Sequence, residues 1–328
     1  MTVRAVFVWI AAILLAIGAC AAAEEGADRL VLRFQPKAGE TRSLRVTTEI
    51  TTVQIVNGQE FKRTQATGLS YDFTAADPGE QGGFSFEVVC RSVAGRLASL
   101  WENLEFDTAA GTVVPEAFRG MAGLAGRVSS VTVSADGAKI EIKTSKTAKS
   151  GVSVLTGDGE IDVMQILALI GLSSGQKDRL SETIRLFFAF LPEHPVGPGE
   201  TWHRRLGAPG IDLGIEADAA ITLRSLEQGL ARLAFSGPIT ARGERSMRQT
   251  LEDDEAGAFT MASFAMSYDL VGELHGTCDL DALSGWPVGM SLVCRLEGRT
   301  TRFGCTYPVT IESRTVIEAS AAASGAED

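Results

Sequence analysis

Residues 41–73 have the sequence TRSLRVTTEITTVQIVNGQEFKRTQATGLSYDF, and this stretch decides the fold class that we expect. Residues 41–56 are rich in Thr and Val and contain neither Gly nor Pro, which is typical of a β-strand. Asn57-Gly58 favours a tight hairpin turn, because both residues of such a pair tolerate positive φ angles. With a returning strand at 59–73, the sequence predicts a long antiparallel hairpin.

Similar patterns continue along the chain. Apolar residues alternate with polar ones from Phe84 to Cys90, which predicts a strand with one buried face. Residues 127–144 predict another hairpin, turned at Ala135-Asp136-Gly137, and strand-like sequence resumes after Pro195. The chain is therefore expected to be rich in antiparallel β-structure.

Residues 160–191 differ from these regions and predict a helical hairpin. The first helix is apolar on nearly all sides, which is typical of a buried helix. Ser173-Ser174-Gly175 interrupts the helical pattern. The second helix carries apolar residues on one face and ends at Pro192, because proline lacks the N–H that would continue the helix.

Together these segments predict an α+β fold dominated by β-structure. We expect long antiparallel strands that curve into one or two partly closed barrels around the central helical hairpin. Gly-Glu-Thr occurs at 39–41 and again at 199–201, each time before a predicted strand, which favours two similar β-rich halves. The expected organisation is a signal peptide at 1–23, an N-terminal β-rich half at 24–159, the helical hairpin at 160–191, a C-terminal β-rich half at 192–318 and a flexible tail at 319–328.

The composition narrows the class of protein. Of the 328 residues, 45% are hydrophobic and 22% are charged, as in an ordinary globular protein rather than a disordered or collagen-like chain. Thirty Lys and Arg residues against 41 Asp and Glu residues give a net charge of −11. An acidic chain without basic clusters does not suit the phosphate backbone of nucleic acids, so we expect no nucleic-acid partner.

The N-terminus has the pattern of an export signal. Arg4 precedes an apolar run at 5–17, and small residues follow, as in a secretory signal peptide. An uncleaved signal anchor is the alternative, because the uncharged stretch at 5–23 could just span a bilayer. Cys20 directly follows Ile17-Gly18-Ala19, which resembles the lipobox in which bacterial lipoproteins are acylated. We therefore expect an exported cell-envelope protein, either attached to the membrane only through a lipid on Cys20 or free in the periplasm or medium.

Export also permits disulfide bonds. Apart from Cys20, the chain contains Cys90, Cys278, Cys294 and Cys305. A hairpin turned near Arg299-Thr300 would place Cys294 opposite Cys305, at a separation that a disulfide can bridge. We consider this pair first and Cys90–Cys278 second, against the alternative that all four are buried free thiols.

The sequence contains no complete catalytic or metal-binding motif. Ser174 and Lys177 match the S-x-x-K pattern of penicillin-recognising enzymes, but the supporting motifs of that class are missing. His194, His203 and His275 lack the spacing of a metal site, and the cysteines form no C-x-x-C pair. We therefore expect no metal, no cofactor and no catalytic residue, as in a non-enzymatic protein.

The second predicted helix contains an unusual concentration of aromatic residues. Residues 186–191 are LFFAFL, which places Phe187, Phe188 and Phe190 within four positions. These rings either fill the space inside a curved sheet or line a groove for a lipid or another apolar ligand, and we take them as candidate ligand contacts. Two alternatives stay open: a structural or assembly protein that binds another envelope protein through a strand edge, and a hydrolase without a recognisable motif.

Short motifs beside this helix carry a family resemblance. They are Phe190-Leu191-Pro192, Pro195-Val196 and PGETW at 198–202, with a helix-then-strand stretch at 115–134 before Ala135-Asp136-Gly137. On these residues the chain resembles a family of bacterial exported proteins, domain of unknown function 6263, over residues 30–318. The resemblance implies an envelope protein or lipoprotein with a β-rich body, and it implies no catalytic residue.

Overall fold

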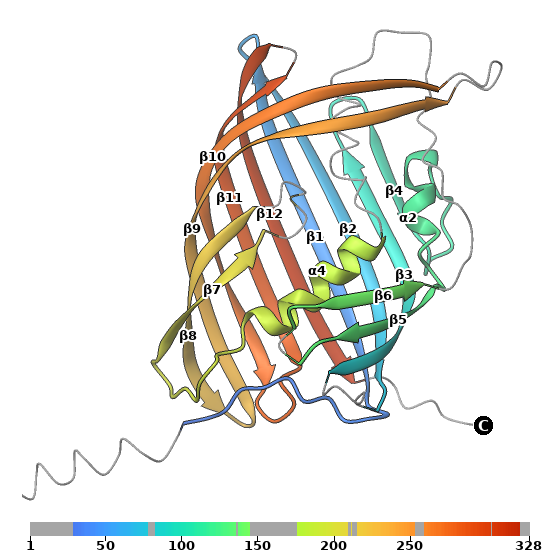
Figure 1. Ribbon diagram of the computed structural model, residues 1–328. Coiled ribbons are helices and arrows are strands. Elements are labelled where there is room, and N and C mark those ends of the chain that lie inside the picture. Colours follow the sequence, from blue (N-terminus) through green and yellow to red (C-terminus); the bar gives the residue numbers. More distant parts are fainter. Residues whose placement is uncertain are drawn as a thin grey trace, which may run out of the picture.

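The computed structural model describes residues 29–77, 83–135, 137–144, 176–208, 211, 215–252, 259–302 and 304–321. These residues form one curved antiparallel sheet of twelve strands (Figure 1). The strands are β1 (Thr41–Val56), β2 (Gln59–Ala75), β3 (Phe84–Ala98), β4 (Asn103–Asp107), β5 (Val128–Val133), β6 (Ile140–Thr144), β7 (Thr201–Gly207), β8 (Glu216–Glu227), β9 (Leu230–Glu252), β10 (Phe259–Asp281), β11 (Pro287–Arg302) and β12 (Cys305–Ala321). The helices are η1 (Glu116–Phe118), α2 (Arg119–Ala122) and α4 (Gln176–Ala189).

The two halves of the chain join in the middle of the sheet. The strand order is β6-β5-β3-β2-β1-β12-β11-β10-β9-β8-β7, with β4 paired to β3 outside this path. The halves meet where β1 pairs with β12, and the hydroxyl oxygens of Thr48 and Thr315 lie 3.1 Å apart across this seam. Within the described residues β6 and β7 end the path without pairing to each other, so the sheet is open. The β-dominated fold is confirmed, whereas closure into barrels is not observed.

The first predicted hairpin is confirmed in detail. β1 and β2 pair from Val56↔Gln59 beside the turn onwards, and Asn57 and Gly58 have φ angles of 51° and 79°. β2 buries every second residue from Arg63 to Ala75. This is the period of a strand with one covered face, because successive side chains point to opposite sides of a sheet.

The two Gly-Glu-Thr sequences share one local structure. Gly39 and Gly199 have φ angles of 77° and 86°, which glycine adopts without strain. In both copies the Gly N–H donates to the backbone carbonyl of one residue in the next strand. The N–H of that same residue donates back to the carbonyl of the Glu. The residues involved are Gly39, Glu40 and Ala75 in the first copy and Gly199, Glu200 and Leu223 in the second. The sequence repeat therefore corresponds to a repeated entry into β1 and β7.

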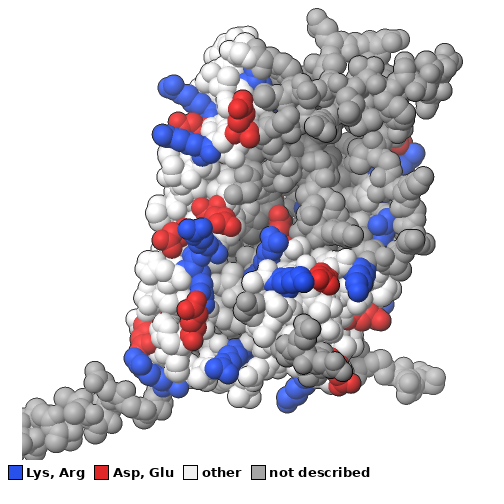
Figure 2. Space-filling model, viewed as in Figure 1, with Lys and Arg blue, Asp and Glu red and all other residues white. Residues whose placement is uncertain are grey.

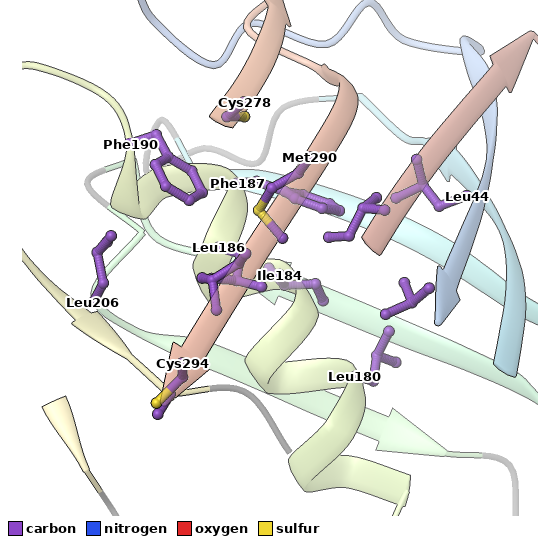
Figure 3. Close-up of a cluster of buried hydrophobic side chains, with 14 of the residues drawn as sticks. Leu44, Leu180, Ile184, Leu186, Phe187, Phe190, Leu206, Cys278, Met290 and Cys294 are labelled. Carbon is purple, nitrogen blue, oxygen red and sulfur yellow. The ribbon is translucent and has the colours of Figure 1, made fainter. Parts of the chain in front are cut away.

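Helix α4 lies on the concave face of the sheet, which we call the inner face (Figure 1). Its buried side chains Leu180, Ile184 and Phe187 lie in one apolar cluster with Leu44 of β1 and Met290 of β11 (Figure 3). α4 corresponds to the second helix of the predicted hairpin, and the first helix lies outside the described residues. No helix in the described part of the chain is both long and apolar enough to cross a membrane.

Residues 29–37 cross one end of the sheet and close the apolar core there (Figure 1). Leu30 forms an isolated bridge with Val196, and the N–H of Gln35 donates to the carbonyl of Ser284 at 2.7 Å. Phe34 is 3% exposed, and its ring centroid lies 4.9 Å from those of Trp286 and Phe188. Phe34 also packs against Phe84 of β3, with ring centroids 5.4 Å apart, so this segment ties the start of the described chain to both halves of the sheet.

Candidate functional site

The inner face changes from polar to apolar along a single strand. In β2 the buried side chains from residue 63 to residue 73, taken in order, are Arg63, Gln65, Thr67, Leu69, Tyr71 and Phe73. Alternate residues of a strand share one face, so these six side chains all lie on the inner face. The first three are polar and the last three are aromatic or aliphatic.

Strand β11 repeats this gradient in the same direction. Read from the β11–β12 turn back along the strand, its buried residues begin with Arg302 and Thr300 and continue with Leu296, Cys294, Leu292 and Met290. The pair Gln54↔Val309 places the β1–β2 and β11–β12 turns at the same end of the sheet. We define the polar end of the inner face by five buried residues: Gln54, Arg63, Gln65, Thr300 and Arg302. The opposite, apolar end holds α4 and the aromatic cluster around Trp286.

Two arginines are buried at the polar end. Arg63 is 8% exposed and Arg302 is 4% exposed. In the described structure Nη2 of Arg63 and both Nε and Nη1 of Arg302 lack a hydrogen-bond partner. Burial lowers the pKa of Arg63 to about 10, against the opposing influence of Glu102, and burial likewise lowers the pKa of Arg302. A buried, unpaired charge destabilises a protein by several kcal/mol, so these guanidinium groups are unusual.

Other buried polar atoms lie deeper in the inner face. The Tyr71 hydroxyl and the Trp286 indole N–H are buried without a partner in the described part of the chain. Burial, reinforced by Cys90, raises the pKa of Tyr71, so its hydroxyl stays neutral near pH 7. Both groups carry donors that could meet an acceptor on a ligand.

The three phenylalanines singled out in the sequence are packed against other side chains. Phe187 is 2% exposed and lies 5.6 Å, centroid to centroid, from both Phe73 and Trp286. Phe190 is 1% exposed and packs on Phe235, with ring centroids 4.9 Å apart. Phe188 is half-buried beside Phe34. In this arrangement they fill the apolar end rather than the polar end.

The four cysteines that the structure describes are unpaired, and the strand register explains why. The β11–β12 turn falls after Arg302, which lies opposite Cys305, instead of near Arg299-Thr300. Cys294 therefore lies opposite Ser313, and the structure does not bring Cys294 and Cys305 together. Cys90 is on β3 and Cys278 on β10, with β2, β1, β12 and β11 between them, so this pair is not brought together either. Cys20 lies outside the described residues.

The histidines are dispersed. His194 and His275 are exposed, and His203 Nδ1 lies 3.8 Å from a carboxylate oxygen of Asp218, also at the surface. Among the described residues, no group of three or more His, Cys, Asp or Glu side chains could hold a metal ion. Ser174 of the S-x-x-K pattern lies outside the described residues. Figure 2 shows basic and acidic side chains interspersed over the viewed face.

Sequence reasoning missed Arg63 and Arg302. The available signal was their phase: each falls on the same alternation as the buried apolar residues of its strand, such as Leu69 in β2 and Leu296 in β11. Extending that alternation to the strand end would have placed both arginines on the inner face.

Fold and site together define a protein with an open, curved antiparallel sheet whose inner face runs from buried cations to an apolar core. The chain belongs to a family of unknown function, DUF6263, whose model matches residues 82–287. The expected family membership is therefore confirmed. No curated protein matches the sequence.

Two solved structures share distant similarity with this chain. One describes lipid–protein interactions in lipovitellin: the identity is 8%, the TM-score is 0.42, and the match covers 89% of this chain but only 26% of the lipovitellin chain. The other is the COG4313 outer membrane channel from Pseudomonas putida F1, with 9% identity, a TM-score of 0.20, and coverage of 88% of this chain and 98% of the channel. Both TM-scores are below 0.5, and neither similarity is evidence of function.

Proposed function

We propose that this protein is an exported, non-enzymatic protein of the bacterial cell envelope that binds a lipid or another apolar ligand on the inner face of its sheet. The observation that carries the proposal is the polar-to-apolar gradient along β2 and β11. A surface that is polar at one end and apolar at the other is complementary to an amphiphilic molecule.

The dimensions of the inner face support this proposal. β2 has 17 residues and is therefore about 56 Å long, whereas α4 has 14 residues and is about 21 Å long. In Figure 1, α4 crosses the part of the sheet near the β10–β11 turn, away from the β1–β2 turn. α4 by itself is thus too short to cover the whole inner face.

Native mass spectrometry of the purified full-length protein tests the proposal. We expect a noncovalent mass in the range of a lipid, which is lost in denaturing solvent and is recovered by organic extraction. A fluorescent fatty-acid probe should bind the delipidated protein with a saturable signal. Absence of both the copurified lipid and the probe signal would refute the proposed function.

The proposed export route has its own test. The motif ending at Cys20 supports acylation of that cysteine, which would hold the protein at a membrane surface. Cells labelled with a clickable palmitate analogue should label the wild-type protein and not a Cys20→Ala variant. Cys305→Ala is the matched control, because that cysteine lies in the last hairpin and should leave labelling unchanged.

The alternative functions have less support. The edge strands β6 and β7 are only five and seven residues long and carry charged residues such as Glu141 and Arg205. Short, charged edges discourage the addition of a partner strand. A hydrolase would need a cluster of titratable groups, and His275 lies exposed on β10, apart from His194 and His203.

A further inference from the structure

We propose that the polar end of the inner face binds the anionic head group of an amphiphile, and that the guanidinium group of Arg63 contacts this anion. This inference rests on the proposed function and adds the chemistry of the ligand. The head group would be a carboxylate or a phosphate, since both accept charge-assisted hydrogen bonds from guanidinium groups.

The first argument is the contrast between buried and exposed arginines. Arg91 and Arg242, both exposed, lie 2.6 and 2.7 Å from carboxylate oxygens of Asp72 and Asp269. Exposed charges need such partners least, because water already solvates them. Arg63, by contrast, is nearly excluded from solvent and has no ion pair with a described carboxylate within 4.0 Å.

Arg302 shows the same pattern more strongly. Two of its guanidinium nitrogens, Nε and Nη1, are buried and unpartnered in the described structure. It lies opposite Cys305, six positions beyond Leu296, and Leu296 is the β11 residue in line with Arg63 across β12 and β1. The two arginines are therefore too far apart to contact one head group. Buried polar groups in folded proteins are almost always satisfied, so the orphaned donor of Arg63 indicates a missing acceptor, and Arg302 provides a comparison at a separate place on the same face.

The surroundings of Arg63 favour an anion over a neutral ligand. Its inner-face neighbours are Thr52 in the facing position of β1 and Gln65 along β2, neither of which is charged. Arg179 of α4 adds a third guanidinium, whose Nη1 donates to Thr67 Oγ1 at 3.3 Å. Glu102 is the one carboxylate that influences the pKa of Arg63, and its side chain is exposed.

The apolar groups near this end favour an amphiphile over a small hydrophilic anion. Trp101 is 57% exposed and Leu100 is 63% exposed in the β3–β4 turn. The Trp101 ring stacks on Phe61, two residues from Arg63, with ring centroids 5.8 Å apart. Exposed aromatic and aliphatic side chains beside buried cations suit a molecule that has both an anionic group and a hydrocarbon chain.

The test compares two probes that differ only in head-group charge: 11-(dansylamino)undecanoic acid and its methyl ester. The full-length, delipidated protein should bind the acid about tenfold more tightly than the ester, and Arg63→Gln should remove most of this preference, whereas Arg302→Gln should not. Arg45→Gln is the matched control, because Arg45 is exposed on the opposite face of β1. It should leave both affinities unchanged.

The outcomes separate this inference from the proposed function. Equal binding of acid and ester, unaffected by Arg63→Gln, overturns the inference and leaves lipid binding intact. Binding of neither probe overturns the proposed function itself. Displacement of the acid by millimolar inorganic phosphate would instead indicate a site for small free anions and would also overturn the assignment to an amphiphile.

A second measurement does not depend on probe binding. Without ligand, Arg63→Gln and Arg302→Gln should raise the melting temperature, because each removes an unpaired buried charge, whereas Arg45→Gln should not. The acid should raise the melting temperature of the wild type more than that of the Arg63→Gln variant. A lower melting temperature for both buried variants without ligand would show that these arginines already have partners, and would contradict the inference.

Discussion

The backbone of Gly285 lies so close to the carbonyl oxygen of Arg33 that no Cβ atom fits between them. Gly285 has a φ angle of 70° and belongs to the turn between β10 and β11. The neighbouring Ser284 carbonyl accepts the N–H of Gln35. This turn therefore holds residues 29–37 against the end of the sheet, and Phe34 reaches the core from that segment.

Gly285→Ala should destabilise the protein through two separate effects. The left-handed φ angle is unfavourable for alanine, and the new methyl group would collide with the backbone of Arg33. Gly111→Ala is the control, because Gly111 has a φ of 65° but open space around it. We expect urea denaturation to show a loss of about 1 kcal/mol for Gly111→Ala and about 2 kcal/mol more for Gly285→Ala. Equal losses would contradict the close packing of residues 29–37.

Phe34→Ala should be among the most destabilising substitutions in the chain. The ring contacts Phe84, Phe188 and Trp286, and it is almost fully buried. Its removal should lower the free energy of unfolding by about 3–5 kcal/mol, as for other buried aromatic residues. Val31→Ala in the same segment should have little effect, because Val31 is 45% exposed. Similar losses of unfolding free energy for Phe34→Ala and Val31→Ala would contradict the buried position of Phe34.

Thiol reactivity should distinguish Cys305 from the other cysteines. Cys305 is exposed, whereas burial raises the pKa of Cys90 to about 11 and that of Cys294 to about 12. A chain that begins at residue 24 should therefore react quickly with a thiol reagent at Cys305 alone, and at all four cysteines in denaturant. Cys305→Ser should abolish the fast reaction. Fewer than four thiols in denaturant without reductant would reveal a disulfide.

Asp281 should make stability depend on acidic pH. Burial alone would raise its pKa, but the backbone N–H groups of Ser284 and Leu283 donate to its carboxylate and lower the pKa below 3.8. A lowered folded-state pKa gives a contribution that is complete above 3.8 and is lost as the pH falls further. Asp281→Asn should therefore cost about 1 kcal/mol at pH 7, and this difference should shrink towards pH 3.

A matched variant controls for general effects of charge. Asp269→Asn removes an exposed carboxylate that pairs with Arg242 and should change stability little, because exposed ion pairs contribute little. Urea denaturation of wild type and both variants from pH 7 to pH 3 measures the difference. A difference for Asp281→Asn that grows towards pH 3 would have the wrong sign for this mechanism.

The strands were predictable from the sequence wherever the signal is local. Asn57-Gly58 defines its turn through the φ angles of two adjacent residues, and the alternation from Phe84 to Cys90 lies within one strand. The second predicted helix, observed as α4, ends before Pro192 for a reason that is equally local. Such features need no knowledge of distant contacts.

The remaining features depend on pairing between distant residues. A turn placed at Arg299-Thr300 rather than after Arg302 changes which residue faces Cys294, because register follows the turn. Residues 29–37 contain no regular element, so only their contacts with Trp286 and Val196 explain their position. The buried arginines were missed because charged residues are normally assigned to solvent.

The pairing of β1 with β12 has a consequence for the order in which the protein can be made. Thr48 and Thr315, hydrogen-bonded across this seam, are 267 positions apart in the chain. While the chain is synthesised, β1 has an unoccupied edge until the last strand arrives. Formation of the seam must therefore wait for the whole chain, and such long-range pairing is slow and exposed to wrong partners. A chain truncated before β12 would keep every hairpin of its first half and still lack the strand that joins the two halves.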